Sequence, residues 1–302
     1  MIASAAVLLC WLGAARTQDV QHVFPPELTR FQLSEKPIFT GEPGKWDAKI
    51  RERGWILREG NLWKLWYTGY DGSKEGRRML GYATSNDGVQ WKRHPGNPLL
   101  PDLWVEDMVV VPHEGKYWMF AEGVRDRAHL LVSDDGVKWQ PRGKLDIRLK
   151  SGEPIADGAY GTPAAFVVEG VWHLFYERND KGVWLATSKD MKVWTNVQDE
   201  PVMTPGPAEH DRDMIALNQV IRHKEKWYAF YHGCATTGPK ARMWNCGVAV
   251  SDDLRRWTKY EKNPILPVEA NVSSCIVVHD GDRFRLYTMH PEIRLHRPKA
   301  AD

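Results

Sequence analysis

The sequence predicts an all-β fold, a five-bladed β-propeller with four antiparallel strands in each blade. Three observations favour this class: one short motif recurs four times, strand-like segments surround every copy, and a fifth set of segments is divided between the two ends of the chain. Self-similarity at intervals of tens of residues is typical of repeat architectures. Each copy of the motif therefore marks one structural unit.

The recurring motif is a turn followed by a tryptophan. Its copies are SNDGVQW at 85–91, SDDGVKW at 133–139, SKDMKVW at 188–194 and SDDLRRW at 251–257. Asp-Gly, or a close relative, supplies the positive φ that a tight hairpin needs. The tryptophan that follows is expected to cover the apolar face of a blade. We interpret the motif as structural and not as a site of chemistry.

Each copy lies among four short segments rich in Val, Ile, Tyr, Phe and Trp, which is the composition of β-strands. In the second copy these segments are MVVVPHEG, KYWMFAEG, AHLLVSDDG and VKWQPRG. Turns that contain Gly or Asp separate them and predict antiparallel hairpins. The four copies thus predict four blades of four strands.

A fifth blade is divided between the chain ends. Near the C-terminus, SSCIVVHDG, RFRLYTMHP and EIRLHRP supply three strands. The fourth is expected at 31–39, FQLSEKPIF, because its tail EKPIF matches the tails GNPLL and KNPIL that follow tryptophan strands elsewhere. A blade built from both ends closes the ring and protects its edges. We expect one such domain over residues 18–302.

The first 17 residues are interpreted as a secretory signal peptide. An apolar run, AAVLLCWL, precedes the small residues GAA, and the run is too short to span a bilayer. The protein is therefore expected to be secreted or periplasmic, with no integral membrane segment after signal removal. Two alternatives stay open: a buried N-terminal strand, and a lipid anchor at Cys10, which lacks the small residue expected before a lipoprotein cysteine.

The charge of the chain bears on its binding partners, and its cysteines bear on disulfide formation. The formal net charge is +2, and no basic block occurs, which argues against nucleic acid as a partner. We expect a monomer. Cys234 and Cys246 flank one predicted hairpin and could form a disulfide in an oxidising compartment. Cys275 lies in an apolar strand and is expected to fill the core.

The topology predicts where polar residues converge. The first strand of each blade lines the axis, and its start lies on the same face as the end of the second strand, because the two are antiparallel. Counting ten residues back from the aromatic that opens each second strand gives Arg53, Asp107, Thr162, Leu217 and Ser274. With the acidic loops nearby, these positions predict an acidic funnel rimmed by arginines.

The chain resembles the five-bladed propeller glycosidases of glycoside hydrolase families 43, 32, 117 and 130. The resemblance covers nearly all residues after 17 and rests on strands such as GKYWMFAEG and KWYAFYHG, the S-D-D-G-x-x-W turns and the N-P-[IL]-L tails. It implies a carbohydrate substrate. It also implies that Asp107, in WVEDMVVV, is the acid that opens the first strand of blade two and binds sugar hydroxyls or tunes the proton donor.

Two blades depart from the family pattern. The pattern has an Asp near Arg53 in blade one, where the nearest acids are Glu52 and Asp47. Families 43 and 32 place a Glu near Thr162 in blade three, and GTPAA has none. The resemblance to family 117, which uses a histidine acid, leaves His210 and His232 as counterparts.

Glycoside cleavage needs a proton donor and a carboxylate that activates water or attacks the sugar, with pKa values held apart. The catalytic candidates are Asp107, Asp47, Glu52, Glu177, Asp213 and His210. The candidates for substrate binding are Arg51, Arg53, Glu106, Glu122, Asp157, Tyr160, His232, His290, Trp46 and Trp104. Aromatic rings can stack on sugars but equally serve blade packing, and loop aspartates often only cap turns.

These observations favour an exported enzyme that hydrolyses O-glycosidic bonds of an oligosaccharide or polysaccharide, with inversion. Phosphorolysis stays open as another way of cleaving the bond. The alternative from a different class is a non-catalytic propeller that binds carbohydrate or protein at the same mouth, which the missing acid in blade three favours. No cofactor or metal ligand is expected, although the resemblance to family 43 also allows a central Ca²⁺.

Overall fold

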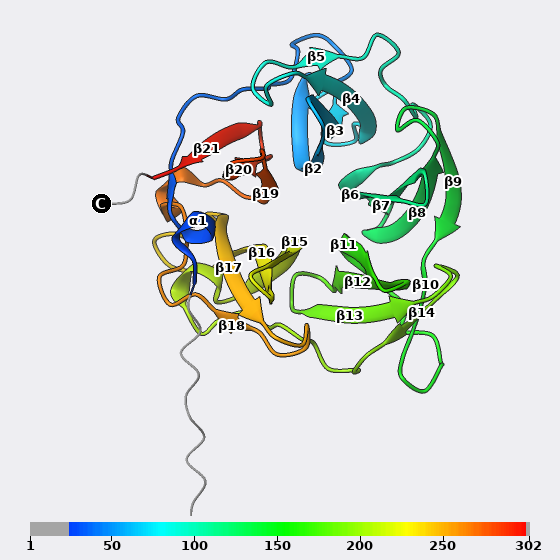
Figure 1. The fold of residues 1–302 in the computed structure, drawn as a ribbon, viewed down its shortest axis with the longest axis vertical. Coiled ribbons are helices and arrows are strands. Elements are labelled where there is room, and N and C mark those ends of the chain that lie inside the picture. Colours follow the sequence, from blue (N-terminus) through cyan, green and yellow to red (C-terminus); the bar gives the residue numbers. More distant parts are fainter. Residues whose placement is uncertain (1–23, 300–302) are drawn as a thin grey trace, which may run out of the picture.

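The computed structural model describes residues 24–299. These residues form five β-sheets arranged as blades around a central axis (Figure 1), which confirms the predicted all-β propeller. The segment interpreted as a signal peptide, 1–17, lies outside the described residues, as does Cys10. Among the described residues, no helix has the length and apolar character needed to cross a bilayer.

Four blades follow one another along the chain, each starting at the axis. Blade one contains β2 (Lys49–Glu59), β3 (Leu62–Tyr70), β4 (Met79–Ser85) and β5 (Lys92–Arg93). Blade two contains β6 (Glu106–His113), β7 (Lys116–Gly123), β8 (Arg127–Ser133) and β9 (Trp139–Lys144). Blade three contains β11 (Gly161–Val168), β12 (Val171–Glu177), β13 (Val183–Ser188) and β14 (Val193–Asn196). Blade four contains β15 (Met214–His223), β16 (Lys226–Cys234), β17 (Asn245–Ser251) and β18 (Thr258–Lys259).

Blade five is assembled from both ends of the described chain. It contains β19 (Ile276–His279), β20 (Phe284–Thr288), β21 (Arg294–Pro298) and, as its outer strand, β1 (Phe31–Gln32). Phe31 lies opposite Pro298. Phe39 extends this pairing, since its carbonyl accepts the Ile293 N–H at 2.9 Å. Figure 1 shows the blue N-terminal segment beside β21, and the predicted closure by residues 31–39 is confirmed.

Blade three departs from the four-strand rule. The connection from blade two supplies β10 (Asp146–Arg148), which pairs in parallel with β14 as a fifth, outer strand. This addition covers the edge of the blade. The helical elements are short and lie between or before the blades: α1 (Pro26–Thr29), η1 (Glu209–Asp211) and η2 (Val268–Ala270).

The recurring turns also connect neighbouring blades. In blade two, the Gly136 carbonyl accepts a hydrogen bond from Trp66 Nε1 of blade one at 2.7 Å. In blade one, the Gly88 carbonyl accepts from the Tyr287 hydroxyl of blade five at 3.2 Å. The equivalent turn residue has a positive φ in all four copies: Gly88 (71°), Gly136 (76°), Met191 (61°) and Leu254 (65°). The motif is therefore a hairpin turn that, in two blades, also contacts the preceding blade.

The disulfide that Cys234 and Cys246 could have formed is absent from the described structure. The three described cysteines are free and buried. In the β16–β17 hairpin the residue opposite Cys246 is His232, so the two thiols are offset along the strands. The Cys234 thiol instead contacts Met214 Sδ at 3.7 Å, and the Cys246 thiol donates to the Val272 carbonyl at 3.6 Å.

Candidate active site

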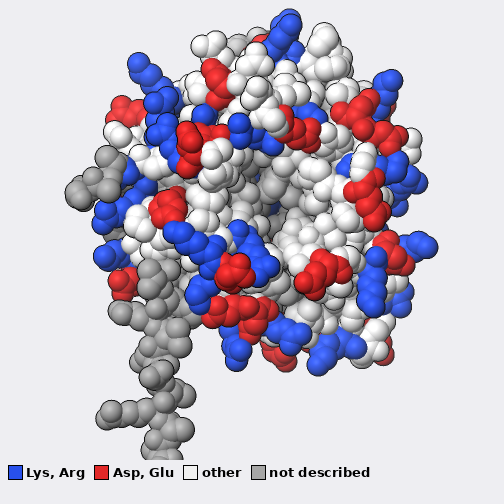
Figure 2. Space-filling model, viewed as in Figure 1, with Lys and Arg blue, Asp and Glu red and all other residues white. Residues whose placement is uncertain are grey.

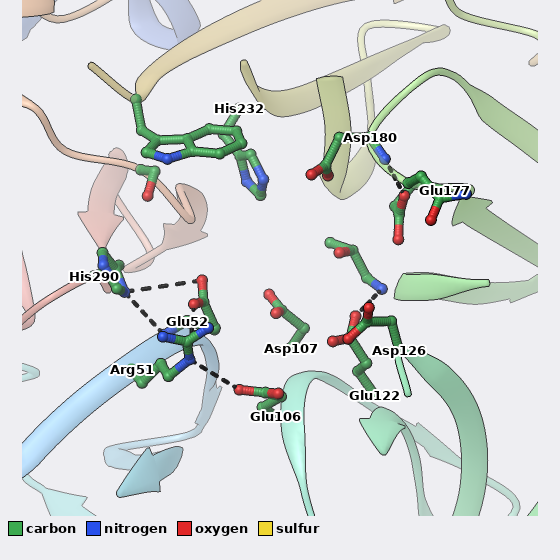
Figure 3. A pocket seen from close by; sticks show the side chains of 14 residues that line it. Arg51, Glu52, Glu106, Asp107, Glu122, Asp126, Glu177, Asp180, His232 and His290 are labelled. Carbon is green, nitrogen blue, oxygen red and sulfur yellow. Dashed lines mark hydrogen bonds and ion pairs between the residues drawn. The ribbon is translucent and has the colours of Figure 1, made fainter. Parts of the chain in front are cut away.

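A cavity of about 380 Å³ opens at the mouth of the ring, where the inner strands begin. We call this cavity the funnel (Figure 3). It is lined by Arg51, Glu52, Glu106, Asp107, Glu122, Asp126, Thr162, Glu177, Asn179, Asp180, His232, Trp244, Ser273 and His290. Seven of these side chains are carboxylic acids, and Arg51 is the only arginine or lysine among them. Elsewhere the charges are mixed, as the face in Figure 2 shows.

A β-bulge near the start of the inner strand presents Asp107 to the funnel. The pairing register of β6 shifts between Glu106 and Val109, and Asp107 within that shift has a φ of 47°. Thr162 takes the same place in β11, with a φ of 42°. Bulges often redirect a side chain toward a site. Asp107 is 5% exposed and lies between the two sides of the funnel in Figure 3.

In blade one this bulge contains one more residue. The register shifts by two positions between Arg51 and Trp55, against one position in blade two. As a result Glu52, with a φ of 51°, takes the place that Asp107 has in its own blade. Counting from the aromatic had aligned Arg53 with Asp107, and the longer bulge corrects that alignment. The acid of blade one is therefore Glu52.

Arg53, predicted to bind substrate, lies buried beneath the funnel instead. Its guanidinium donates five hydrogen bonds to backbone carbonyls, those of Asp107, Met108, Pro163, Leu217 and Asn218. These carbonyls belong to β6, β11 and β15, so Arg53 from β2 joins four inner strands. Burial lowers the pKa of Arg53 to about 10, and the group stays protonated at neutral pH. All five donors are used, which leaves none for a sugar.

On one side of the funnel, Arg51 lies between two carboxylates. Its Nε is 3.0 Å from Glu52 Oε1 and 3.3 Å from Glu106 Oε2. Burial and the charge of Glu106 raise the pKa of Glu52 to about 7, against the attraction of Arg51. Burial and the charge of Glu52 likewise raise the pKa of Asp107 to about 7. Glu52 and Asp107 therefore titrate as a pair near neutral pH.

On the other side, two glutamates from the ends of β7 and β12 flank a glycine. Glu122 accepts the Thr162 N–H at 2.9 Å, and Glu177 accepts the Asp180 N–H. A Cβ on Gly161 would collide with Glu122 Oε2 and would lie 2.8 Å from Glu177 Oε1. Glycine is therefore required for both carboxylates to reach the funnel. Burial and the charge of Asp180 raise the pKa of Glu177 to about 8.

The two histidines of the funnel are neutral at physiological pH. Burial, with the nearby charge of Arg53, lowers the pKa of His232 to about 3. Burial and Arg51 lower the pKa of His290 to about 4. His232 Nδ1 lies 2.8 Å from Asn218 Oδ1, so it carries the proton and leaves Nε2 as an acceptor. Both rings can bind hydroxyl groups, but neither is a charged proton donor.

Three catalytic candidates lie outside the funnel. Asp47 is 1% exposed within blade one, where it pairs with Arg93 Nε at 2.9 Å. Asp213 accepts from the Thr236 N–H at 2.7 Å, and this bond and the Arg212 ion pair lower its pKa to about 2. His210 is directed into blade four, as described next. These three residues were chosen because they lie in loops near the predicted mouth. Their hydrogen bonds and ion pairs within the blades could not be predicted from that position.

His210 and four predicted substrate-binding residues do not line the funnel. His210 Nε2 is 3.4 Å from the Tyr231 hydroxyl. Asp157 pairs with Arg127 at the surface. Trp46 stacks on Tyr67, Tyr160 pairs with Arg127 as an isolated bridge, and Trp104 donates to Glu106 at 2.7 Å. Of the sixteen predicted residues, eight line the funnel: Arg51, Glu52, Glu106, Asp107, Glu122, Glu177, His232 and His290.

Two acids and one amide of the funnel were not predicted from the sequence. Asp126, Asn179 and Asp180 come from the loops that leave the second strands of blades two and three. A signal was present: each of these strands ends in Glu, and an Asp follows three or four residues later, in EGVRD and ERND. Because these loops cross the mouth, an Asp in them is placed beside the strand-end Glu.

A central Ca²⁺ does not fit the described residues. No group of three or more His, Cys, Asp or Glu within 24–299 is arranged to hold a metal ion. At the centre of the inner strands, the Arg53 guanidinium already occupies the carbonyl oxygens that a hard cation prefers. A second cation at those oxygens would be repelled by it.

Comparison with known proteins agrees with this architecture. Residues 162–280 match the family model described as glycosyl hydrolases family 32 N-terminal domain. Two uncharacterized proteins of Mycobacterium tuberculosis are 29% identical over 100 residues, which cover 30% of this chain and 33% of theirs. The chain thus matches about a third of the length of these curated relatives.

Solved structures share nearly the whole fold. A candidate glycosidase from Bacteroides thetaiotaomicron has a TM-score of 0.75 and 18% identity, covering 92% of this chain and 99% of its own. A glycosyl hydrolase from Bacteroides ovatus has a TM-score of 0.72 and 16% identity, covering 91% and 95%. The chain resembles the propeller glycosidases. This confirms the predicted resemblance to propeller glycosidases, without assigning one family.

The propeller glycosidase resemblance also extends to a phosphorylase. A β-1,2-mannobiose phosphorylase from Listeria innocua has a TM-score of 0.66 and 16% identity, covering 88% of this chain and 95% of its own. At these identities the likeness shows the fold alone. The chemistry must be argued from the funnel.

Proposed function

We propose that the protein is an exported glycosidase that hydrolyses an O-glycosidic bond of an oligosaccharide or polysaccharide in the funnel. The observation that carries this proposal is the convergence of seven carboxyl groups in one cavity, with Glu52 and Glu177 on its two sides. Burial raises the pKa of Glu177 to about 8 and that of Glu52 to about 7, and the nearby Arg51 favours the ionised form of Glu52. Acid and base catalysis of glycoside cleavage uses such a pair of carboxyl groups. The family-model match and the propeller neighbours support a glycoside-active enzyme.

Glu177 is the proposed proton donor. Its raised pKa keeps the carboxyl protonated at neutral pH, when the glycosidic oxygen needs a proton. The Asp180 N–H donates a hydrogen bond to the Glu177 carboxyl group, and the absence of a side chain at Gly161 leaves room for it. Glu177 would thus take the role of the Glu that families 43 and 32 have near the position of Thr162.

Glu52 is the proposed base that activates water. It lies across Asp107 from Glu177 in Figure 3, and Arg51 favours its ionised form at 3.0 Å. A base and an acid on opposite sides of the sugar, with room for water, is the arrangement that inverts the anomeric configuration. Asp107, between them, binds sugar hydroxyls and raises the pKa values of its neighbours.

Water rather than phosphate is the proposed acceptor. Phosphate carries up to two negative charges at neutral pH and needs cations or N–H donors. Among the residues that line the funnel, Arg51 is the only arginine or lysine, and Glu52 and Glu106 already engage it. The carboxyl groups of the funnel that are ionised would repel the anion. Added phosphate should therefore leave the rate of glycoside cleavage unchanged.

The test is a screen of purified protein against neutral, acidic and amino-sugar glycosides, with product configuration followed by NMR. On any cleaved substrate, Glu177→Gln should lower kcat by roughly 100-fold or more. The wild-type activity is expected to decline as the pH rises past 8, and the variant should lack this decline. The exposed Glu261→Gln is the matched control. Binding of glycans without cleavage of any would instead identify a carbohydrate-binding propeller.

A further inference from the structure

A second cavity lies beside the funnel on blade two. Its volume is about 420 Å³, and we call it the blade-two pocket. The residues that give it chemical character are Trp104, Val124, Arg125, Arg127, His129 and Lys144. Three of them carry positive charge, in contrast with the funnel, where seven acids surround one arginine.

The two cavities share one loop and are linked by one hydrogen bond. Asp126 lines the funnel, and its chain neighbours Arg125 and Arg127 line the blade-two pocket. Trp104 lines the pocket, while its indole N–H donates at 2.7 Å to Glu106 of the funnel. A linear ligand can therefore place one unit in each cavity.

Two buried nitrogen atoms of residues that line the blade-two pocket have no hydrogen-bond partner among the described residues. His129 is 8% exposed, and its Nε2 is buried without a hydrogen-bond partner. Arg127 pairs with Asp157 through one nitrogen, but its Nε is buried and unpaired. A buried polar atom without a partner is costly and rare, and both residues line the same cavity.

Two further cationic side chains at the pocket form no hydrogen bond or ion pair with any described residue. These are Arg125 and Lys144, both exposed. The acid at the rim, Asp102, pairs with Arg77 at 3.2 Å. The unpaired charges of the pocket are therefore positive. The Trp104 ring and Val124, which is 60% exposed, line the same pocket. Such a mixture of cations with an aromatic ring suits a charged sugar.

We propose that the blade-two pocket is an anion subsite, which takes the carboxylate or sulfate of an acidic glycan whose next unit occupies the funnel. This inference rests on the proposed function and narrows the substrate class. The funnel repels anions, so the charged unit is bound next to the scissile bond and not within the acid cluster. Arg125 and Lys144 hold the anion, and His129 Nε2 and Arg127 Nε supply buried hydrogen-bonding positions beneath it.

The experiment measures binding to a glycan array with matched neutral, uronic acid and sulfated oligosaccharides, followed by calorimetry on those retained. Acidic glycans should bind more tightly than their neutral counterparts. An Arg125→Gln/Lys144→Gln variant should lose this preference by about tenfold or more, as expected for charge-assisted hydrogen bonds. Uronic and sulfated arms show which anion is preferred. The exposed Lys138→Gln/Arg142→Gln pair on the same blade is the control.

Each other outcome overturns the subsite. Equal affinity for neutral and acidic glycans would do so, as would an unchanged preference in the double variant with an unchanged melting temperature. Sodium sulfate or phosphate that binds as tightly as the glycan would reduce the pocket to a general anion site. If neutral glycosides are cleaved but acidic ones are not preferred, the proposed function stands and only the subsite fails.

Discussion

The Arg53 N–H donates to the Asp107 carboxylate at 3.2 Å, while the Arg53 guanidinium donates to the Asp107 carbonyl. One residue of blade one thus holds both the backbone and the side chain of the central acid of blade two. The same guanidinium reaches carbonyls of blades three and four. The floor of the funnel is therefore fixed by a buried cation, the Arg53 guanidinium, which donates to backbone carbonyls beneath the acids.

Asp107→Asn should remove activity and leave the fold intact. The amide oxygen can still accept the Arg53 N–H, but the charge near the substrate is lost. We expect kcat/KM to fall by roughly 100-fold or more, equivalent to about 3 kcal/mol of transition-state stabilisation. Melting temperature and specific activity measure the two effects.

The controls for that variant are Asp87→Asn and Asp135→Asn. Each aspartate accepts two backbone N–H groups of its turn, at 2.7–2.8 Å, and neither lines the funnel. These changes should lower the melting temperature and leave kcat near the wild-type value. Full activity in Asp107→Asn would show that the funnel is not organised as proposed.

The free energy of unfolding should fall as the pH rises from 6.5 to 8.5. Glu177 has a folded pKa of about 8, above its unfolded value, so the folded state binds more protons in this range. The stability from its neutral form is complete below the unfolded pKa and is lost as the pH passes 8. His232 has a lowered pKa and opposes this trend only below about pH 6.5.

The measurement is the melting temperature of wild type and Glu177→Gln across that pH range. The neutral amide does not titrate, so the stability of the variant should decline less than that of wild type, and the difference should grow toward pH 8.5. Parallel curves for the two proteins would contradict a raised pKa at Glu177.

Arg53→Lys should destabilise the ring although it conserves the charge. A lysine has three donors in place of five, and each buried carbonyl left without a partner costs about 1–3 kcal/mol. We expect a loss of about 3 kcal/mol or more, measured by chemical denaturation. Arg255→Lys, at an exposed position, is the control and should change little. Equal denaturation midpoints for both variants would show that Arg53 does not join the blades.

Gly88→Ala should destabilise the contact between blades one and five. Its φ is 71°, and an added Cβ would lie 2.8 Å from the Tyr287 hydroxyl and 3.0 Å from the Trp63 ring. The left-handed backbone costs about 1–2 kcal/mol, and the collision adds about 1–3 kcal/mol. Gly115→Ala has a similar φ, 72°, with nothing within 4 Å. In thermal unfolding, the melting temperature of Gly88→Ala should be well below that of Gly115→Ala.

The sequence alone determined the fold class because blades repeat and their signals are local. Alternating apolar residues and Asp-Gly turns act over fewer than ten residues. The closing strand at 31–39 could be predicted because its tail matches the tails of the other blades, and the structure pairs its Phe31 with Pro298. Eight of the sixteen predicted site residues line the funnel for the same reason, since the start of each first strand and the end of each second strand must meet at one mouth.

Only the tertiary structure decided which acids share the funnel. One extra residue in the bulge of β2 places Glu52 beside Asp107 and turns Arg53 beneath both, and no local pattern in RERGW indicates that. Asp47 forms an ion pair with Arg93, which lies in a strand more than forty residues further along the chain. Side-chain partners, burial and the pKa values they set depend on contacts between blades, and those contacts are determined when the ring closes.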